Sequence, residues 1–416
     1  MAVSPDVDVR QPGRTRMIVV LGLLVALGPL TIDMYLPALP KIAEELAVSS
    51  SVVQLTLTGT LAGLALGQLI VGPLSDSLGR RKPLMAGIVL HMLASLWCMF
   101  ATDITMLGIA RGLQGMGAAA AMVVAIAVVG DLYADSVAAT VMSRLMLVLG
   151  VAPVLAPSLG AAVLVHGSWH WVFAALVVAA AALLVMAALA LPETLAVDHR
   201  RPLRARAITL TYLELLRDIR FVILVLVGAL GMSGLFAYIA GASFVLQGRF
   251  GLGQTAFALV FGAGAVALIG TTQCNVLLLR RYAPQQIMVW ALAAAVVAGL
   301  VFVALASTGI GGVVGFVVPV WAILGAMGLV IPNAPAVALT RHPDAAGTAA
   351  ALLGAVQFGA GAAVAPLVGI LGNDELAMAL VMASGVSLAL LALLATGSHK
   401  VVSRDDAVEP AVARHG

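Results

Sequence analysis

Long apolar segments alternate with short polar ones along most of this chain. Twelve of the segments reach or approach the ~20 residues that a helix needs to cross a bilayer. They cover residues 17–39, 52–74, 84–102, 104–130, 140–165, 169–191, 221–246, 255–279, 287–306, 310–339, 348–372 and 375–396. The pattern therefore predicts an all-α polytopic membrane protein with 12 transmembrane helices and both termini on one side.

One long polar connection in the middle of the chain separates the first six predicted spans from the last six. The sequence APSLG at Ala156–Gly160, in the fifth span, is echoed by APLVG at Ala365–Gly369, in the eleventh. Corresponding positions of this kind are typical of a duplicated six-helix unit. The expected division is a tail (1–16), a six-helix bundle (17–191), a linker (192–220), a second six-helix bundle (221–396) and a tail (397–416).

Composition and charge exclude a soluble globular protein. Hydrophobic residues make up 62% of the chain and charged residues only 10%, against roughly 45–50% and 25% in soluble domains. Of the 22 Lys and Arg, 19 fall in the termini and the even-numbered loops, which predicts cytoplasmic termini in the cell membrane. This sorting accounts for the net charge of +3 without a nucleic-acid partner.

Neither a metal site nor an enzyme active site is expected. The 2 cysteines, Cys98 and Cys274, lie in or beside apolar segments, and the 7 histidines have no metal-ligand spacing. No nucleophile, base and orienting acid are grouped in the sequence. The chain is therefore not expected to be an enzyme or to need a cofactor.

The turn between the second and third spans carries the motif GPLSDSLGRRK. The positions of Gly72, Asp76, Gly79 and Arg80 in it resemble the loop signature of the major facilitator superfamily. In that family the Asp and the first Arg lock the two halves on the cytoplasmic side and release them during transport. The resemblance implies a cytoplasmic gate made of these four residues and Asp131, which lies in the sequence GDLY at the end of the fourth span.

Asp33 and Arg111 are ionisable residues inside predicted spans, where burial costs at least ~2.5–3.5 kcal/mol. Their distances from the span ends place both about 10 Å below the outer surface, so they could meet directly or through a substrate. A carboxylate there can be neutralised by a proton or by a cationic ligand, and a nearby fixed cation would couple the two events. The alternative is that each residue caps a frayed helix end or extends to the membrane interface.

Two stretches around these residues extend the resemblance. TIDMYLPALPKIAEEL, at Thr31–Leu46, and RGLQGMGAA, beginning at Arg111, resemble the twelve-span drug–proton antiporters of the bicyclomycin and chloramphenicol resistance (Bcr/CflA) group. The resemblance implies a role for Arg111 in proton coupling. From their burial, we expect Asp33 to be the protonatable site and Arg111 its electrostatic partner. Some relatives carry a second acid two turns earlier in the first helix, where this chain has Val25, so their proton stoichiometry cannot be transferred.

The fifth span resembles the motif typical of exporters. Its sequence is GVAPVLAPSLGAA, in which Ala161 replaces the second of the two glycines that usually end the motif. Prolines and glycines at these positions would bend the helix and allow close packing, and packing explains them as well as transport direction does. The motif residues are Gly150, Pro153, Pro157 and Gly160.

Aromatic, polar and methionine side chains within the spans are candidates for lining a substrate cavity, because adaptable apolar surfaces suit promiscuous binding. Packing in the protein core or against lipid is the alternative for each of them. The candidates are Met34, Tyr35, Gln114, Phe236, Tyr238, Asn333, Gln357 and Phe358.

Together these features predict a proton-coupled multidrug efflux transporter. We expect a monomer in the lipid bilayer that exports hydrophobic drug-like compounds, such as chloramphenicol or bicyclomycin, by alternating access, with the proton gradient as its energy source. One alternative is an exporter of an endogenous metabolite, sugar or peptide. A membrane sensor or scaffold that does not transport is a second alternative.

Overall fold

The computed structural model describes residues 14–200, 205–342 and 345–395. Every regular element in these ranges is a helix, and 12 helices are long and apolar enough to cross a membrane. The predicted all-α fold with twelve spans is confirmed. The predicted tails, 1–16 and 397–416, lie outside the described residues except for positions 14–16, which belong to the first helix instead.

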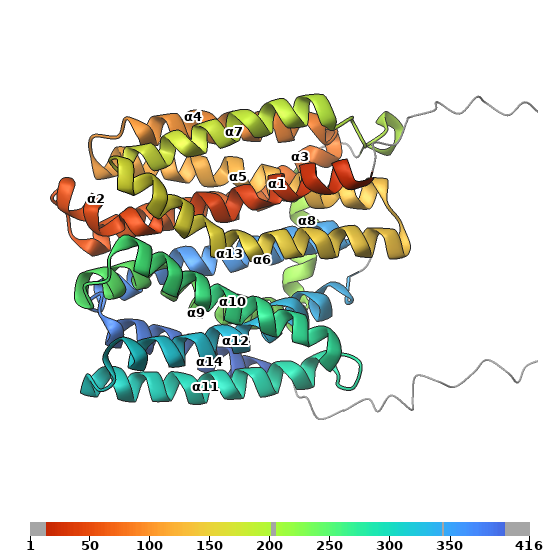
Figure 1. The fold of residues 1–416 in the computed structure, drawn as a ribbon. Coiled ribbons are helices and arrows are strands. Elements are labelled where there is room, and N and C mark those ends of the chain that lie inside the picture. Colours follow the sequence, from red (N-terminus) through yellow and green to blue (C-terminus); the bar gives the residue numbers. More distant parts are fainter. Residues whose placement is uncertain (1–13, 201–204, 343–344, 396–416) are drawn as a thin grey trace, which may run out of the picture.

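The helices form two layers, which are stacked one above the other in Figure 1. The first layer contains α1 (Arg14–Asp33), η1 (Leu36–Ala38), α2 (Leu39–Glu45), α3 (Ser50–Leu78), α4 (Arg81–Met99), α5 (Ile104–Leu132), α6 (Asp135–His166) and α7 (His170–Ala190). The second contains α9 (Ile219–Ser243), the π-helical turn η3 (Phe244–Arg249), α10 (Gln254–Leu278), α11 (Pro284–Thr308), α12 (Gly312–Leu339), α13 (Ala346–Ile370) and α14 (Glu375–Ala395). We call these layers the N-terminal half and the C-terminal half.

The two ends of the bundle differ in the residues that they carry. The start of α1, Arg80 and the end of α14 lie at one end, which we call the basic end. Asp103 and Glu375 lie at the opposite end, which we call the far end. At the far end, the carboxylate of Asp103 accepts hydrogen bonds of 2.9 Å from the amides of Thr105 and Met106 and so caps α5.

The first predicted span is not a continuous helix. Helix α1 ends at Asp33, and the chain continues through η1 into α2, which ends at Glu45. Pro37 contributes to the interruption, because proline has no amide hydrogen and cannot donate to the Asp33 carbonyl four residues earlier. Pro40 instead lies in the first turn of α2, where helices tolerate proline. Asp33 therefore lies at a helix end, where carbonyl groups of the last turn are free to accept other donors.

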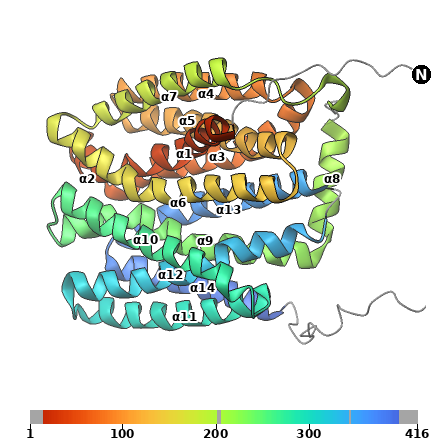
Figure 2. The ribbon, with the colours of Figure 1, turned by 45° about the vertical axis from the view of Figure 1, so that its right-hand side comes forward.

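The predicted linker contains two helices, η2 (Val197–His199) and α8 (Ala205–Arg217), which hydropathy alone did not indicate. Helix α8 is amphipathic and lies across both halves at the basic end, as Figure 2 shows. Leu215 is buried in a small cluster with α9 and α13, whereas the Tyr212 hydroxyl donates to the Leu69 carbonyl of α3 at 3.4 Å. The linker is thus attached to both halves.

Asp218 joins this linker to the C-terminal half at the basic end. Its carboxylate caps α9 by accepting from the Phe221 amide, and it also lies 2.8 Å from Arg341 and 3.0 Å from His342. Partial burial raises the pKa of Asp218, but the hydrogen bonds, first that of Arg341, outweigh this effect and hold the pKa below its usual value.

The two halves meet along the pairs α3–α13 and α6–α10. A Cβ placed on Gly369 of α13 would lie 2.7 Å from the Cβ of Ser51 in α3, so only glycine fits at this far-end crossing. At the basic end, a Cβ on Gly72 of α3 would lie 4.0 Å from the Cβ of Ala351 in α13. These two helices are therefore close to one another at both ends.

Candidate functional site

Arg111 of α5 is completely buried in the N-terminal half. Its Nη1 donates to the Thr31 carbonyl at 2.9 Å and to Gln114 Oε1 at 2.6 Å. The Thr31 carbonyl belongs to the last turn of α1, where a cation is favoured by the helix dipole. The guanidinium carbon also lies 4.5 Å from the ring centre of Tyr35 and 5.8 Å from that of Phe173, within the range of cation–π attraction.

A chain of hydrogen bonds supports Arg111 from α1 and α4. Thr31 donates its hydroxyl hydrogen to the Leu27 carbonyl, so its oxygen accepts from Nε2 of His91 at 2.8 Å. Gln114 in turn donates to Ser95 at 2.8 Å, and His91 and Ser95 lie one turn apart on α4. His91 was not among the site residues predicted from the sequence, although an ionisable residue in the middle of the third predicted span is an indication of a functional role.

Asp33 is 97% buried at the end of α1, and no described residue forms a hydrogen bond or ion pair with its carboxylate; Oδ1 is fully enclosed. Arg111 likewise has no carboxylate partner, and its Nε and Nη2 are buried without an acceptor. Asp33 and Arg111 therefore do not form the direct contact that their similar depth in the membrane would permit. The two residues lie buried in the same half without contacting each other.

The candidate cavity residues fall into separate groups. Tyr35 and Gln114 contact Arg111 in the N-terminal half, and Met34 is buried nearby in the chain after α1. Asn333 of α12 instead pairs with Asn275 of α10, donating to its side-chain oxygen at 2.7 Å. The Asn333 contact joins two helices of the C-terminal half.

The aromatic candidates other than Tyr35 lie in the C-terminal half. Tyr238 stacks on Phe261 with ring centres 4.8 Å apart, and Phe236 lies 6.0 Å from Phe358. Gln357 and Phe358 are half-buried neighbours on α13. The structure therefore brings Phe236 and Phe358 together but places them in a different half from Tyr35.

Arg80 forms a dense cluster at the basic end. Its Nε and Nη2 donate to the two oxygens of Asp131 at 2.8 and 3.2 Å, and its Nη1 donates to Ser75 and to Asp76. Burial lowers the pKa of Arg80, but the hydrogen bonds to Asp131 and Asp76 raise it more, so Arg80 remains charged. We call these four residues the Arg80 cluster.

Glu193 and Thr194, which follow α7, extend the Arg80 cluster and were not found from the sequence. Glu193 accepts hydrogen bonds from the amides of Arg80 and Arg81 at 2.8 and 3.2 Å, and Thr194 donates to Asp131 at 2.8 Å. Every hydrogen-bond partner of the Arg80 side chain among the described residues belongs to the N-terminal half. The cluster thus joins α3, α5 and the chain after α7, and its role as a gate remains a prediction.

The glycines of the loop motif allow close approach. Gly79 has a φ of 90°, and a side chain there would collide with the Glu193 carboxylate.

In α6, a Cβ on Gly160 would collide with the Met34 carbonyl, and one on Gly150 would lie 3.1 Å from Ile269 of α10. The two prolines between them, Pro153 and Pro157, are inside α6.

Polar side chains join the two halves at the far end. Ser243, at the end of α9, is fully buried and donates to the Leu36 carbonyl of η1 at 2.6 Å. Gln247 donates to the Pro37 carbonyl at 3.3 Å and to Ser243 at 2.7 Å.

Gln54 of α3 makes further contacts between the halves at this end. Its amide donates to the Ala240 carbonyl at 3.0 Å and to Asn373 at 2.7 Å, both in the C-terminal half. We call Gln54, Ser243 and Gln247 the far-end latch. The far-end latch thus joins the two halves by side-chain hydrogen bonds.

Comparison with known proteins identifies the family to which this chain belongs. The model of the Major Facilitator Superfamily matches residues 21–366, which is most of the chain. The chain belongs to the major facilitator superfamily. Members of this superfamily are transporters of small molecules, so the prediction that the chain is not an enzyme is confirmed.

Individual superfamily members agree with this assignment. The chain is 30% identical over 391 residues to a bicyclomycin resistance protein homolog of Haemophilus influenzae, covering 93% of this chain and 97% of the relative. It is 42% identical over 258 residues to YdgK of Bacillus subtilis, an uncharacterized MFS-type transporter, covering 62% of this chain and 64% of the relative. The predicted resemblance to the bicyclomycin and chloramphenicol resistance group is confirmed.

Solved structures of the superfamily share the fold. A crystal structure of a D-xylose–proton symporter matches with a TM-score of 0.72 and 16% identity, covering 91% of this chain and 97% of the symporter. At this identity the match supports the fold alone. The chain is therefore a multi-pass membrane transporter of the major facilitator fold.

Proposed function

We propose that this transporter exports hydrophobic drug-like compounds in exchange for protons, as a monomer in the cell membrane with its basic end in the cytoplasm. The observation that carries the proposal is that Asp33 and Arg111 are both buried ionisable residues that do not contact each other. Because the two side chains do not pair, the Asp33 carboxylate is available to a proton or a cationic ligand, and Arg111 is available to a ligand that accepts hydrogen bonds.

A buried carboxylate without a partner is costly, because desolvation of an ion costs several kcal/mol even after relaxation. Binding of a proton to Asp33 removes this cost, and exposure of Asp33 to water allows the proton to leave. Arg111 cannot lose its charge, and its place beside the end of α1 makes it a fixed cation within the same half. Access to Asp33 from one side at a time would thus couple proton movement to the movement of the halves.

The membrane potential can drive this cycle. Moving one charge through 100 mV supplies about 2.3 kcal/mol, and a proton gradient adds to this value. The Arg80 cluster and the far-end latch lie at opposite ends, as two gates that open alternately would.

The name of the full-length relative, a bicyclomycin resistance protein homolog, supports a drug-like substrate. The buried aromatic residues of both halves, Tyr35, Phe236 and Tyr238, would supply apolar contacts to such a molecule. Chloramphenicol and bicyclomycin are therefore the first compounds to test.

The test is drug resistance in a susceptible host that lacks its own efflux pumps. We expect the wild-type chain to raise the inhibitory concentrations of chloramphenicol or bicyclomycin and the Asp33→Asn variant to give no protection. Asp103→Asn is the matched control, because Asn caps a helix as well as Asp does and residue 103 is exposed at the far end. Equal resistance with wild type and empty vector for every drug tested would contradict the proposal and favour an endogenous solute.

A further inference from the structure

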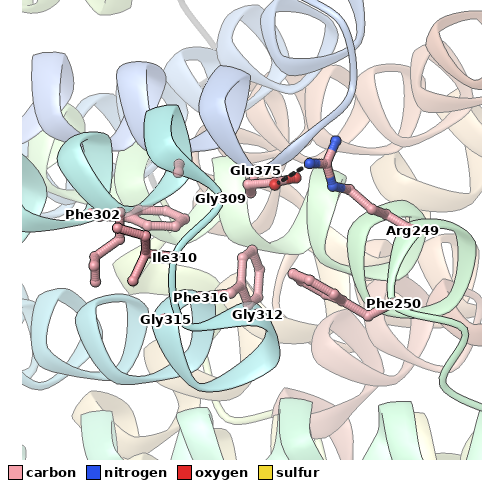
Figure 3. Close-up of a pocket in the computed structure, with 11 residues that line it drawn as sticks. Arg249, Phe250, Phe302, Gly309, Ile310, Gly312, Gly315, Phe316 and Glu375 are labelled. Carbon is pink, nitrogen blue, oxygen red and sulfur yellow. Dashed lines mark ion pairs between the residues drawn. The ribbon is translucent and has the colours of Figure 1, made fainter.

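A small cavity lies at the far end of the C-terminal half, away from Asp33 and Arg111. Its volume is about 70 Å³, and the ends of η3, α11, α12 and α14 surround it. Figure 3 shows three aromatic rings on its sides, from Phe250, Phe302 and Phe316. The centre of the Phe316 ring lies 6.0 Å from that of Phe250 and 5.5 Å from that of Phe302.

The acidic group of this cavity is incompletely paired. Glu375, the first residue of α14, is 94% buried, and its Oε1 lies 2.7 Å from Nη2 of Arg249. Its second oxygen, Oε2, is buried and has no hydrogen-bond partner among the described residues. An unpaired buried carboxylate oxygen is unfavourable, so its retention beside a cavity calls for a ligand that donates to it.

We propose that this cavity binds the ammonium group of a small organic amine. An ammonium group supplies both the positive charge and the N–H donors that Glu375 Oε2 lacks. The faces of phenylalanine rings attract cations electrostatically, and three such rings line the cavity together with the carboxylate. A cavity of about 70 Å³ is far below the roughly 300–1,000 Å³ of pockets for drug-sized ligands, so this site is separate from drug transport.

Arg249 is the internal competitor for this site. Its guanidinium forms an ion pair with Glu375, as Figure 3 shows, and 54% of its side chain is exposed. Because the Arg249 side chain is largely exposed, its guanidinium can move into water while an entering ammonium group takes its place beside Glu375. Removal of the Arg249 charge should therefore strengthen binding, whereas removal of the Glu375 charge should abolish it.

Titration calorimetry of the full chain in lipid nanodiscs tests the site, with methylammonium chloride as the probe and sodium chloride at the same ionic strength as the reference. We expect wild type to bind methylammonium in preference to sodium. Glu375→Gln keeps the shape of the side chain and should weaken binding at least tenfold. Arg249→Gln should strengthen it about two- to fivefold, the range expected when a weak competing ion pair is lost.

Two further variants separate this site from general charge effects and from transport. Glu44→Gln removes an exposed carboxylate at the same end of the molecule and should leave methylammonium binding unchanged. Asp33→Asn should also leave it unchanged, whatever that variant does to drug export. The absence of methylammonium binding in both wild type and Arg249→Gln would overturn the proposal, as would equal binding by Glu375→Gln and wild type.

Discussion

The far-end latch makes a quantitative prediction at Ser243. Replacing Ser243 by alanine removes one hydroxyl group and leaves the rest of the fully buried side chain in place. The variant loses the hydrogen bond to the Leu36 carbonyl, which joins the two halves, and the acceptor for Gln247. Helix packing around the residue is otherwise kept, so the effect should fall on closure of the far end rather than on folding.

The magnitude follows from hydrogen bonds between membrane helices. Such bonds contribute about 0.6 kcal/mol on average and up to about 1.7 kcal/mol. Ser243→Ala should therefore shift the equilibrium toward a far end that is open by roughly 3- to 20-fold. A population of open molecules that is small in the wild type becomes measurable after a shift of this size.

Distances between spin labels on the two halves measure this shift. Exposed positions at the far end, Ser49 in the N-terminal half and Thr308 in the C-terminal half, can carry the labels after Cys98 and Cys274 are replaced by alanine. In pulsed electron paramagnetic resonance, we expect Ser243→Ala to show a larger population of molecules with a long distance between the two labels.

Ser233→Ala is the matched control for this experiment. Ser233 lies on the same helix and is equally buried, but its hydroxyl donates to the Leu230 carbonyl within α9. Its distance distribution should match that of the wild type. An unchanged distribution in Ser243→Ala, or an equal shift in both variants, would refute the reasoning that the latch closes the far end.

Three further variants test other parts of the structure. Arg80→Lys keeps the charge but loses the paired hydrogen bonds to Asp131, so its free energy of unfolding should fall by about 1.5–3 kcal/mol, which thermal unfolding in detergent would detect. His91→Leu removes the hydrogen bond to Thr31, the residue whose carbonyl accepts from Arg111. The variant should export drugs several-fold more slowly than wild type but still purify as a folded monomer. Export rates equal to those of wild type would mean that His91 only fills space. The pKa of Asp218 is held below its usual value, so its carboxylate stabilises the fold above about pH 4. This contribution is lost as the pH falls through the pKa of Asp218 in the native state. Between pH 6 and pH 3 the unfolding temperature of wild type should therefore fall more than that of Asp218→Asn.

The membrane-spanning helices could be predicted from the sequence because each is a long segment whose average hydropathy is high. The twelve spans were predicted in this way, whereas α8 was not, because its apolar residues lie on one face of a short helix between charged ones. The break after Asp33 was also missed, although Pro37 was visible, since a window of average hydropathy does not register local backbone geometry.

The site was less predictable because its contacts join residues that are distant in sequence. The loop motif located Arg80, but Glu193 becomes its neighbour only through the packing of α7 beside α4. Depth along a helix placed Asp33 and Arg111 at one level, yet depth does not determine the direction in which each side chain points. The contact between Ser243 and Leu36 spans 207 positions and left no local signal.

The most direct test of the proposed antiport is drug-driven proton movement in proteoliposomes. Chloramphenicol or bicyclomycin is added to vesicles that hold a pH gradient and contain wild type, Asp33→Asn or the control Asp103→Asn, and the internal pH is recorded. Proton flux that requires a drug, persists in Asp103→Asn and is lost in Asp33→Asn is the predicted result. Drug-driven flux in Asp33→Asn equal to that of the wild type would contradict the account, because the buried, unpaired carboxylate would then have no part in coupling.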